Sequence, residues 1–186
     1  MKAIVLCRPE RQICLGVPVL FLVGTLCHFI YQLSGELFLV GLFMPINESV
    51  WEHLKMTLWP TILWWSIYYA AAGRHRSIDA PAWFAGALGA VLSAQATIVL
   101  TFYFYTGAFG IESLAVDVVL FFCAVLLGQV VGLRLYHRGS AADWFLPLMV
   151  LAALMALFAI LTIVPPDLPL FADPESGTRG IFRVMG

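Results

Sequence analysis

The first long apolar run, residues 13–33, reads ICLGVPVLFLVGTLCHFIYQL and contains no Asp, Glu, Lys or Arg. A membrane-crossing helix needs about 20 predominantly apolar residues, and this run is long enough. A cleaved signal peptide has a shorter apolar core, which ends at small residues where the peptidase cuts. The run is too long for that and has no such ending. We therefore interpret residues 13–33 as a retained membrane span.

Further spans follow the first. Four other stretches are long and mostly apolar: 53–73, 82–106, 114–136 and 143–164. Residues 35–44, GELFLVGLFM, hold too few consecutive apolar positions to cross, so we expect a short re-entrant or interfacial segment. The sequence thus predicts one all-α integral-membrane domain over residues 1–186. It has five transmembrane helices and an outer tail, 165–186, that we expect to fold back as an ordered lid.

The composition excludes several classes of protein. Of the 186 residues, 62% are hydrophobic and 11% are charged, and the mean hydropathy is +0.94. A soluble domain of this length cannot bury so much apolar surface, so a soluble enzyme, a disordered regulator and a secreted disulfide scaffold are excluded. The net charge of −1 gives no basic field for nucleic acid. The expected partner is the lipid bilayer.

Basic residues indicate the orientation, because Lys and Arg are enriched in cytoplasmic loops. One side of the predicted bundle carries seven of them: Lys2, Arg8, Arg11, Arg74, Arg76, Arg134 and Arg138. The other side carries Lys55, Arg179 and Arg183. We therefore predict a multi-pass protein of the cell membrane, with its N-terminus in the cytoplasm and its C-terminus outside.

The densest polar stretch, residues 45–55, reads PINESVWEHLK and falls on the predicted outer side. If it is helical, Glu48 and Glu52 share one face and Ser49 and His53 share the next. Ser49 and Glu52 also have the spacing of a capping box. Capping explains Asn47, Ser49 and Glu52, but it leaves Glu48 and His53 unexplained.

Two more polar residues, His28 and Asp117, reach the same predicted depth. Imidazoles and carboxylates are zinc ligands, so we predict a site for a divalent metal such as zinc, with His28, His53 and Asp117 as ligands. Glu52 or Glu48 would be the general base for hydrolysis of a lipid-like or other membrane-associated small-molecule substrate. The remaining polar residues assigned to this site are Asn47, Ser49, Trp51, Lys55, Glu112 and Asp173.

Alternative interpretations remain open. The same residues could form the relay of a proton- or ion-coupled transporter, or the acidic face of a non-catalytic accessory protein. The glycines Gly128 and Gly132 form a GxxxG pattern, which we interpret as helix packing within one subunit rather than a dimer contact. The oligomeric state is not predicted.

The polar stretch also carries a family resemblance. The string Pro45-x-Asn-Glu-Ser-Val-Trp-Glu-His-x-Lys55 resembles the signature of an uncharacterised prokaryotic membrane family, domain of unknown function 6512. Residues 28–34, Asp117 with Gly128-Gln129, and tail residues 166–178 also fit, so the resemblance covers nearly the whole chain; Arg179 departs from the pattern. It implies a small multi-span membrane protein, but no established activity or substrate.

Overall fold

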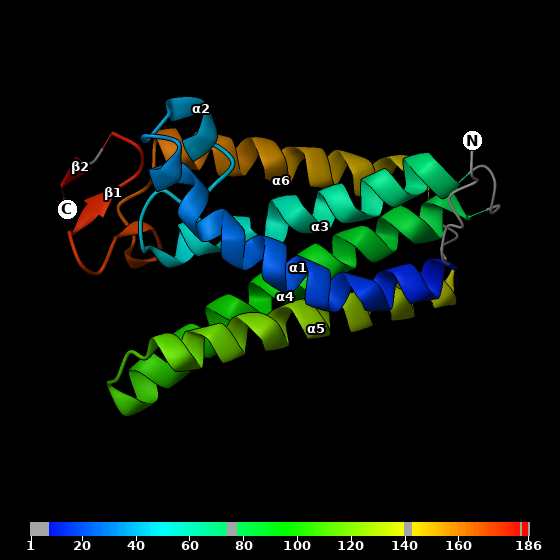
Figure 1. The fold of residues 1–186 in the computed structure, drawn as a ribbon, viewed down its shortest axis with the longest axis horizontal. Helices are drawn as coiled ribbons and strands as arrows, with labels where there is room; N and C mark the ends of the chain where they lie inside the picture. The colour runs from blue at the N-terminus through cyan, green and yellow to red at the C-terminus, as the bar shows by residue number, and fades with distance from the viewer. Residues whose placement is uncertain (1–7, 74–77, 140–142, 183, 186) are drawn as a thin grey trace.

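The long helices lie side by side along one direction in the computed structural model (Figure 1). The structure describes residues 8–73, 78–139, 143–182 and 184–185. Its helices are α1 (Pro9–Leu33), α2 (Phe38–Gly41), α3 (Val50–Ala72), α4 (Ala80–Phe109), α5 (Leu114–Arg138) and α6 (Phe145–Ile163). A 3-10 turn, η1 (Pro169–Phe171), precedes β1 (Thr178–Arg179) and β2 (Val184–Met185), which pair antiparallel. The predicted all-α class is confirmed.

In the part of the chain that the structure describes, four helices, α1, α4, α5 and α6, are long and apolar enough to cross a membrane, which indicates a membrane protein. The remaining predicted span, 53–73, corresponds to α3, which has the length but not the apolarity. Between 22% and 28% of the most apolar window is buried in the other four helices, whereas more than half of α3 is buried. Because α3 is surrounded by protein more than the others are, its surface can be less apolar.

Helices α4 and α5 approach closely through small residues. A Cβ atom added to Gly128 would lie 2.8 Å from the carbonyl oxygen of Ala90, and one on Gly132 would lie 2.9 Å from that of Gly86. Only glycine permits backbones to come this near. The GxxxG pattern therefore packs within one subunit, as predicted.

The start of α3 is built by short polar side chains. Ser49 is the N-cap, and its Oγ accepts a hydrogen bond from the backbone N–H of Glu52 at 3.3 Å. The predicted capping box is only half present, because the Asn47 side chain accepts from the Ser49 N–H while Glu52 accepts from the N–H of Ile46. Since the helix begins at Val50, Glu48 lies outside it and does not share a helical face with Glu52.

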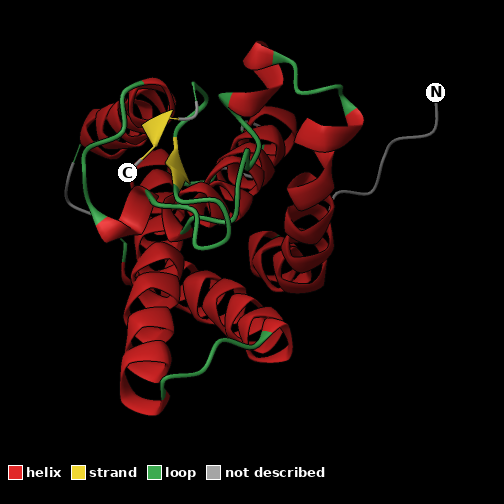
Figure 2. Ribbon diagram, turned by 90° about the vertical axis from the view of Figure 1, so that its left-hand side faces the viewer, coloured by secondary structure: helices red, strands yellow, loops and turns green. Residues whose placement is uncertain are grey.

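The tail returns over one end of the bundle, as the expected lid does. Figure 2 looks onto this end and shows the strands and loops in front of the helix ends. Phe171 is buried and packs on Trp51 at 4.7 Å between ring centroids, and Trp51 stacks on Phe158 at 4.1 Å. The Ile181 N–H donates to the Thr162 carbonyl at 2.9 Å. The short helix α2 lies at the same end (Figure 1).

Part of the charge pattern falls outside the described residues. These positions are Lys2, Arg74, Arg76 and Arg183. The first turn of α1 and the tail strands lie at opposite ends of the bundle (Figure 1). A chain that crosses a membrane an odd number of times would have these two segments on opposite sides of that membrane.

Candidate metal centre

Three side chains from separate segments meet under the tail-covered end. They are His28 of α1, Glu48 of the loop before α3, and His53 in the first turn of α3. The Nε2 atom of His28 lies 3.5 Å from one Glu48 oxygen, and Nε2 of His53 lies 3.4 Å from the other. One ligand atom from each residue falls within 4.8 Å of the other two. The group is half-buried.

The His53 ring is fixed by the backbone. Its Nδ1 lies 2.9 Å from the carbonyl oxygen of Ser49, and because a carbonyl only accepts, Nδ1 carries the proton. In the neutral ring, Nε2 then presents its lone pair to the Glu48 carboxylate, which also has only lone pairs to offer. That contact is favourable only when a cation, either a proton or a metal ion, lies between the two atoms.

Bonds of about 2.1 Å to a tetrahedral zinc place neighbouring ligand atoms about 3.4 Å apart. The two contacts with Glu48 are close to this value, but they use different oxygens of its carboxylate. The three ligand atoms lie within 4.8 Å of one another, so the side chains would move closer together to bind an ion. Two His and one Glu are also the ligands of one common type of catalytic zinc site, which leaves a fourth position open. The Nδ1 of His28 is buried without a hydrogen-bond partner among the described residues, so only His53 has the outer hydrogen bond usual for a metal ligand.

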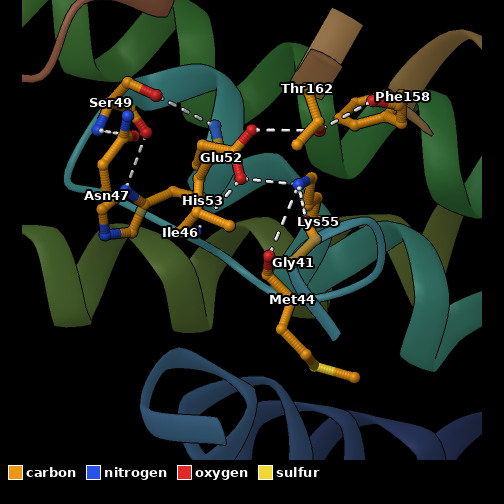
Figure 3. Close-up of polar contacts among 10 residues, drawn as sticks. All are labelled: Gly41, Met44, Ile46, Asn47, Ser49, Glu52, His53, Lys55, Phe158 and Thr162. Carbon is orange, nitrogen blue, oxygen red and sulfur yellow. Dashed lines mark hydrogen bonds and ion pairs between the residues drawn. The ribbon is translucent and has the colours of Figure 1, made fainter. Parts of the chain in front are cut away.

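Glu52, the other predicted base, is committed elsewhere. Its Oε2 lies 2.6 Å from Nζ of Lys55, and its Oε1 accepts from the Thr162 hydroxyl at 3.2 Å (Figure 3). Lys55 also donates to the carbonyl oxygens of Gly41 at 2.7 Å and Met44 at 3.4 Å. Both charged side chains are buried. This pair ties α3 to the α2 segment and to α6, so it positions the loop that carries Glu48.

Asp117, the third predicted ligand, lies in the first turn of α5 and accepts a hydrogen bond from the Tyr105 hydroxyl at 2.7 Å. The third group beside the two imidazoles is Glu48 rather than Asp117. Glu112 is exposed in the α4–α5 connection. Asp173 belongs to the tail, where its Oδ1 accepts from the N–H groups of Glu175 and Ser176.

A cavity of about 290 Å³ adjoins the three-residue group and shares Glu48 with it. Its walls come from the end of α1, the loop before α3 and the tail. Sequence reasoning placed Asn47, Glu48 and Asp173 at the site but missed Tyr31, Gln32 and Glu36, which also line the cavity. One signal was available for Glu36: it follows Gly35 between two apolar runs, where a turn is expected. Its φ is 60°, which is uncommon for a residue other than glycine.

Comparison with known proteins gives one match. A family model described as "Family of unknown function (DUF6512)" matches residues 1–181. No curated protein matches the chain, and no solved structure does.

Proposed function

The chain belongs to DUF6512, a family of unknown function, so its activity has to be inferred from its own residues, and we propose that it is an integral-membrane, metal-dependent hydrolase. The single observation that carries this proposal is the convergence of His28, Glu48 and His53, with Nε2 of His53 3.4 Å from a Glu48 oxygen. The metal would be a divalent ion such as zinc.

The proposed topology has five crossings, with α3 as the central helix. The N-terminus would be cytoplasmic and the C-terminus outside the cell membrane, as the distribution of Lys and Arg indicates. Helix α2 would lie in the interface rather than re-enter the bilayer, because Leu37, Leu39 and Phe43 are exposed at the end of the bundle. The metal centre would then lie at the outer surface, beneath the tail.

A zinc ion held by His28, Glu48 and His53 would supply a nucleophile at neutral pH, because zinc lowers the pKa of a bound water to about 7. His28 and His53 would hold the ion, and Glu48 would complete the set and link it to the cavity. Glu52 has both oxygens engaged, so we assign it to positioning the loop. The site faces the bilayer surface in this topology, which favours a membrane-associated substrate.

The decisive measurement is the metal content of protein purified in detergent without chelators, after incubation with zinc and removal of the excess. We expect about one zinc per chain by elemental mass spectrometry, with loss in His28→Ala and His53→Ala. His137→Ala is the matched control, because this exposed histidine lies in the last turn of α5 and should not change the zinc content.

Two results would count against the proposal. Wild-type protein without stoichiometric metal would remove the metal centre itself. If both histidine variants retained zinc, the zinc would be bound at a different site. If the wild type holds zinc as expected, the next measurement is hydrolysis of ester and amide substrates delivered in mixed micelles. The rate of zinc-loaded wild type is compared with that of His53→Ala after the same incubation with zinc. Equal rates in the two proteins would reject catalysis at this centre.

A further inference from the structure

Helices α1 and α5 face each other through one row of side chains on each helix. Phe21 of α1 packs on Phe121 of α5 at 5.8 Å between ring centroids. A Cβ atom added to Gly24 of α1 would lie 2.6 Å from the same Phe121 ring and 2.8 Å from the carbonyl oxygen of Met56 in α3. Three helices therefore meet around Phe121, which is buried.

Toward the tail-covered end, the same two rows carry polar groups. On α1, His28 follows Phe21 by two helical turns and Gly24 by about one, so the α1 row is Phe21, Gly24 and His28. On α5, Asp117 lies about one turn outward of Phe121, and its Oδ1 accepts from the Tyr105 hydroxyl of α4 at 2.7 Å. The metal group and the Tyr105–Asp117 pair therefore lie on facing rows, outward of the contact at Phe121.

The two rows separate toward this end, where the start of α5 lies away from α1, α2 and the tail (Figure 1). The exposed fractions agree with this divergence. Phe121 is 9% exposed, whereas Leu114, two turns farther out on the same face of α5, is 80% exposed. The side chains of His28 and His53 are 27% and 31% exposed. In the proposed topology, the space between the rows is open to the lipid of the outer leaflet.

The depth of the metal group selects the part of a lipid that it would meet. His28 precedes Leu33, the last residue of α1, by about 7.5 Å along the helix axis. A bilayer about 40–45 Å thick has a hydrocarbon core of about 30 Å, so each polar layer is about 5–8 Å deep. With the end of α1 at the membrane surface, the metal group would lie where headgroups meet tails. The acyl ester bonds of lipids lie at that depth.

We infer that a lipid of the outer leaflet enters between α1 and α5 and binds with its acyl ester between His28 and Asp117. Its tail would lie against the apolar contact of Phe21 with Phe121. The inference deepens the proposed function by naming lipid acyl esters as the substrate class, and in that respect it rests on it. In the hydrolysis, the water oxygen bonds to the acyl carbon, the ester C–O bond breaks, and one water proton passes to the leaving oxygen.

The test is photolabelling of metal-free, chelator-treated protein in phosphatidylcholine nanodiscs, so that binding is measured without the metal. The probe is phosphatidylglycerol with a diazirine next to its acyl ester, present as a minor component. We expect the label at His28 and Asp117 at least about tenfold more often than at Ala115, a preference of about 1.4 kcal/mol. Ala115 is exposed and lies beside Leu114 in depth, but on another face of α5.

Two variants locate the entry. Leu114→Trp places a larger side chain between the two rows, so it should lower labelling of His28 and Asp117 several-fold. Ala115→Trp is the matched control, because it adds the same ring at nearly the same depth on another face, and it should leave this labelling unchanged. Release of fatty acid from phosphatidylglycerol by zinc-loaded protein should fall in the first variant and not in the second.

Three other outcomes would change the conclusion. Label distributed evenly around α5, or labelling of His28 and Asp117 that Leu114→Trp does not lower, would overturn the inference. A mass of two chains by sedimentation, with this face of α5 unlabelled, would replace the lipid with a second copy of the chain. Labelling as expected without fatty acid release from zinc-loaded protein would reject the proposed hydrolase and leave the lipid site in place.

Discussion

The carbonyl oxygen of Ser49 accepts a hydrogen bond from Nδ1 of His53 at 2.9 Å. The hydroxyl of the same serine caps α3 by accepting from the N–H of Glu52. One residue therefore both starts the helix and fixes the tautomer of the imidazole one turn later. The start of α3 and the orientation of the candidate ligand are thus set together.

Glu48 should contribute directly to metal affinity. In Glu48→Gln the side chain keeps its size but loses the charge that faces both imidazoles, so we expect zinc affinity to fall at least about tenfold. Competition with a chromophoric chelator measures this. Glu112→Gln serves as the control because Glu112 is an exposed carboxylate outside the group. Affinities within about twofold of wild type in Glu48→Gln would remove Glu48 from the ligand set.

The buried ion pair should behave as a structural element. In Lys55→Met the carboxylate of Glu52 stays buried 2.6 Å from where the ammonium was, now without its charge partner. We expect this to lower the free energy of unfolding by about 3–5 kcal/mol. Glu52→Leu/Lys55→Met removes both charges and should recover most of that loss. Denaturant unfolding in detergent measures both variants.

A different result would revise the role of Glu52. If the double variant were as unstable as Lys55→Met alone, the charge pairing would not be the stabilising feature. Glu52→Gln should also leave the zinc content unchanged. A loss of zinc in that variant at an unchanged free energy of unfolding would return Glu52 to the metal site.

The helices were well predicted from the sequence because lipid-facing segments must be apolar over their whole length. The predicted spans 13–33 and 114–136 end within two residues of the ends of α1 and α5. Two helix starts were predicted too late: α1 was expected from residue 13 but begins at Pro9, and α3 was expected from residue 53 but begins at Val50. The polar first turn of α3 faces other protein segments, and hydropathy does not distinguish such a turn from a loop.

The candidate site was only partly predictable. His28, Glu48 and His53 were placed at one depth, and they do meet. Asp117 was placed at that depth too, but it contacts Tyr105 instead. Depth is one coordinate, and it does not determine which helices are neighbours. The helical spacing that paired Glu48 with Glu52 did not apply, because Glu48 precedes the N-cap.

The tail should be held by the buried aromatic contact of Phe171 with α3. Phe171→Ala removes the ring that packs 4.7 Å from Trp51, and loss of a buried Phe costs about 3–5 kcal/mol. Tail opening should become at least about a hundredfold more frequent, at tenfold per 1.4 kcal/mol. Trypsin cleavage after Arg179, which pairs with Asp167 in the closed tail, measures the opening. Leu168→Ala, at an exposed apolar tail residue, should leave the rate nearly unchanged. Equal rates in the two variants would contradict this anchoring.

Close packing of α4 on α5 should make Gly128 intolerant of even a methyl group. The added Cβ in Gly128→Ala would lie 2.8 Å from the backbone oxygen of Ala90. Backbone cannot move aside as a flexible side chain can, so we expect a loss of about 1–3 kcal/mol in unfolding free energy. Gly107→Ala in α4 is the matched control, because a Cβ there meets nothing within 4 Å. Alanine should stabilise that helical position by about 0.5–1 kcal/mol.

The free energy of unfolding in detergent should therefore change in opposite directions for the two variants, while the mass of the protein by sedimentation should be the same in both. Stabilisation by both variants would mean that α4 and α5 are farther apart at Gly128 than described. A change of mass in Gly128→Ala alone would instead make this glycine face a contact between subunits.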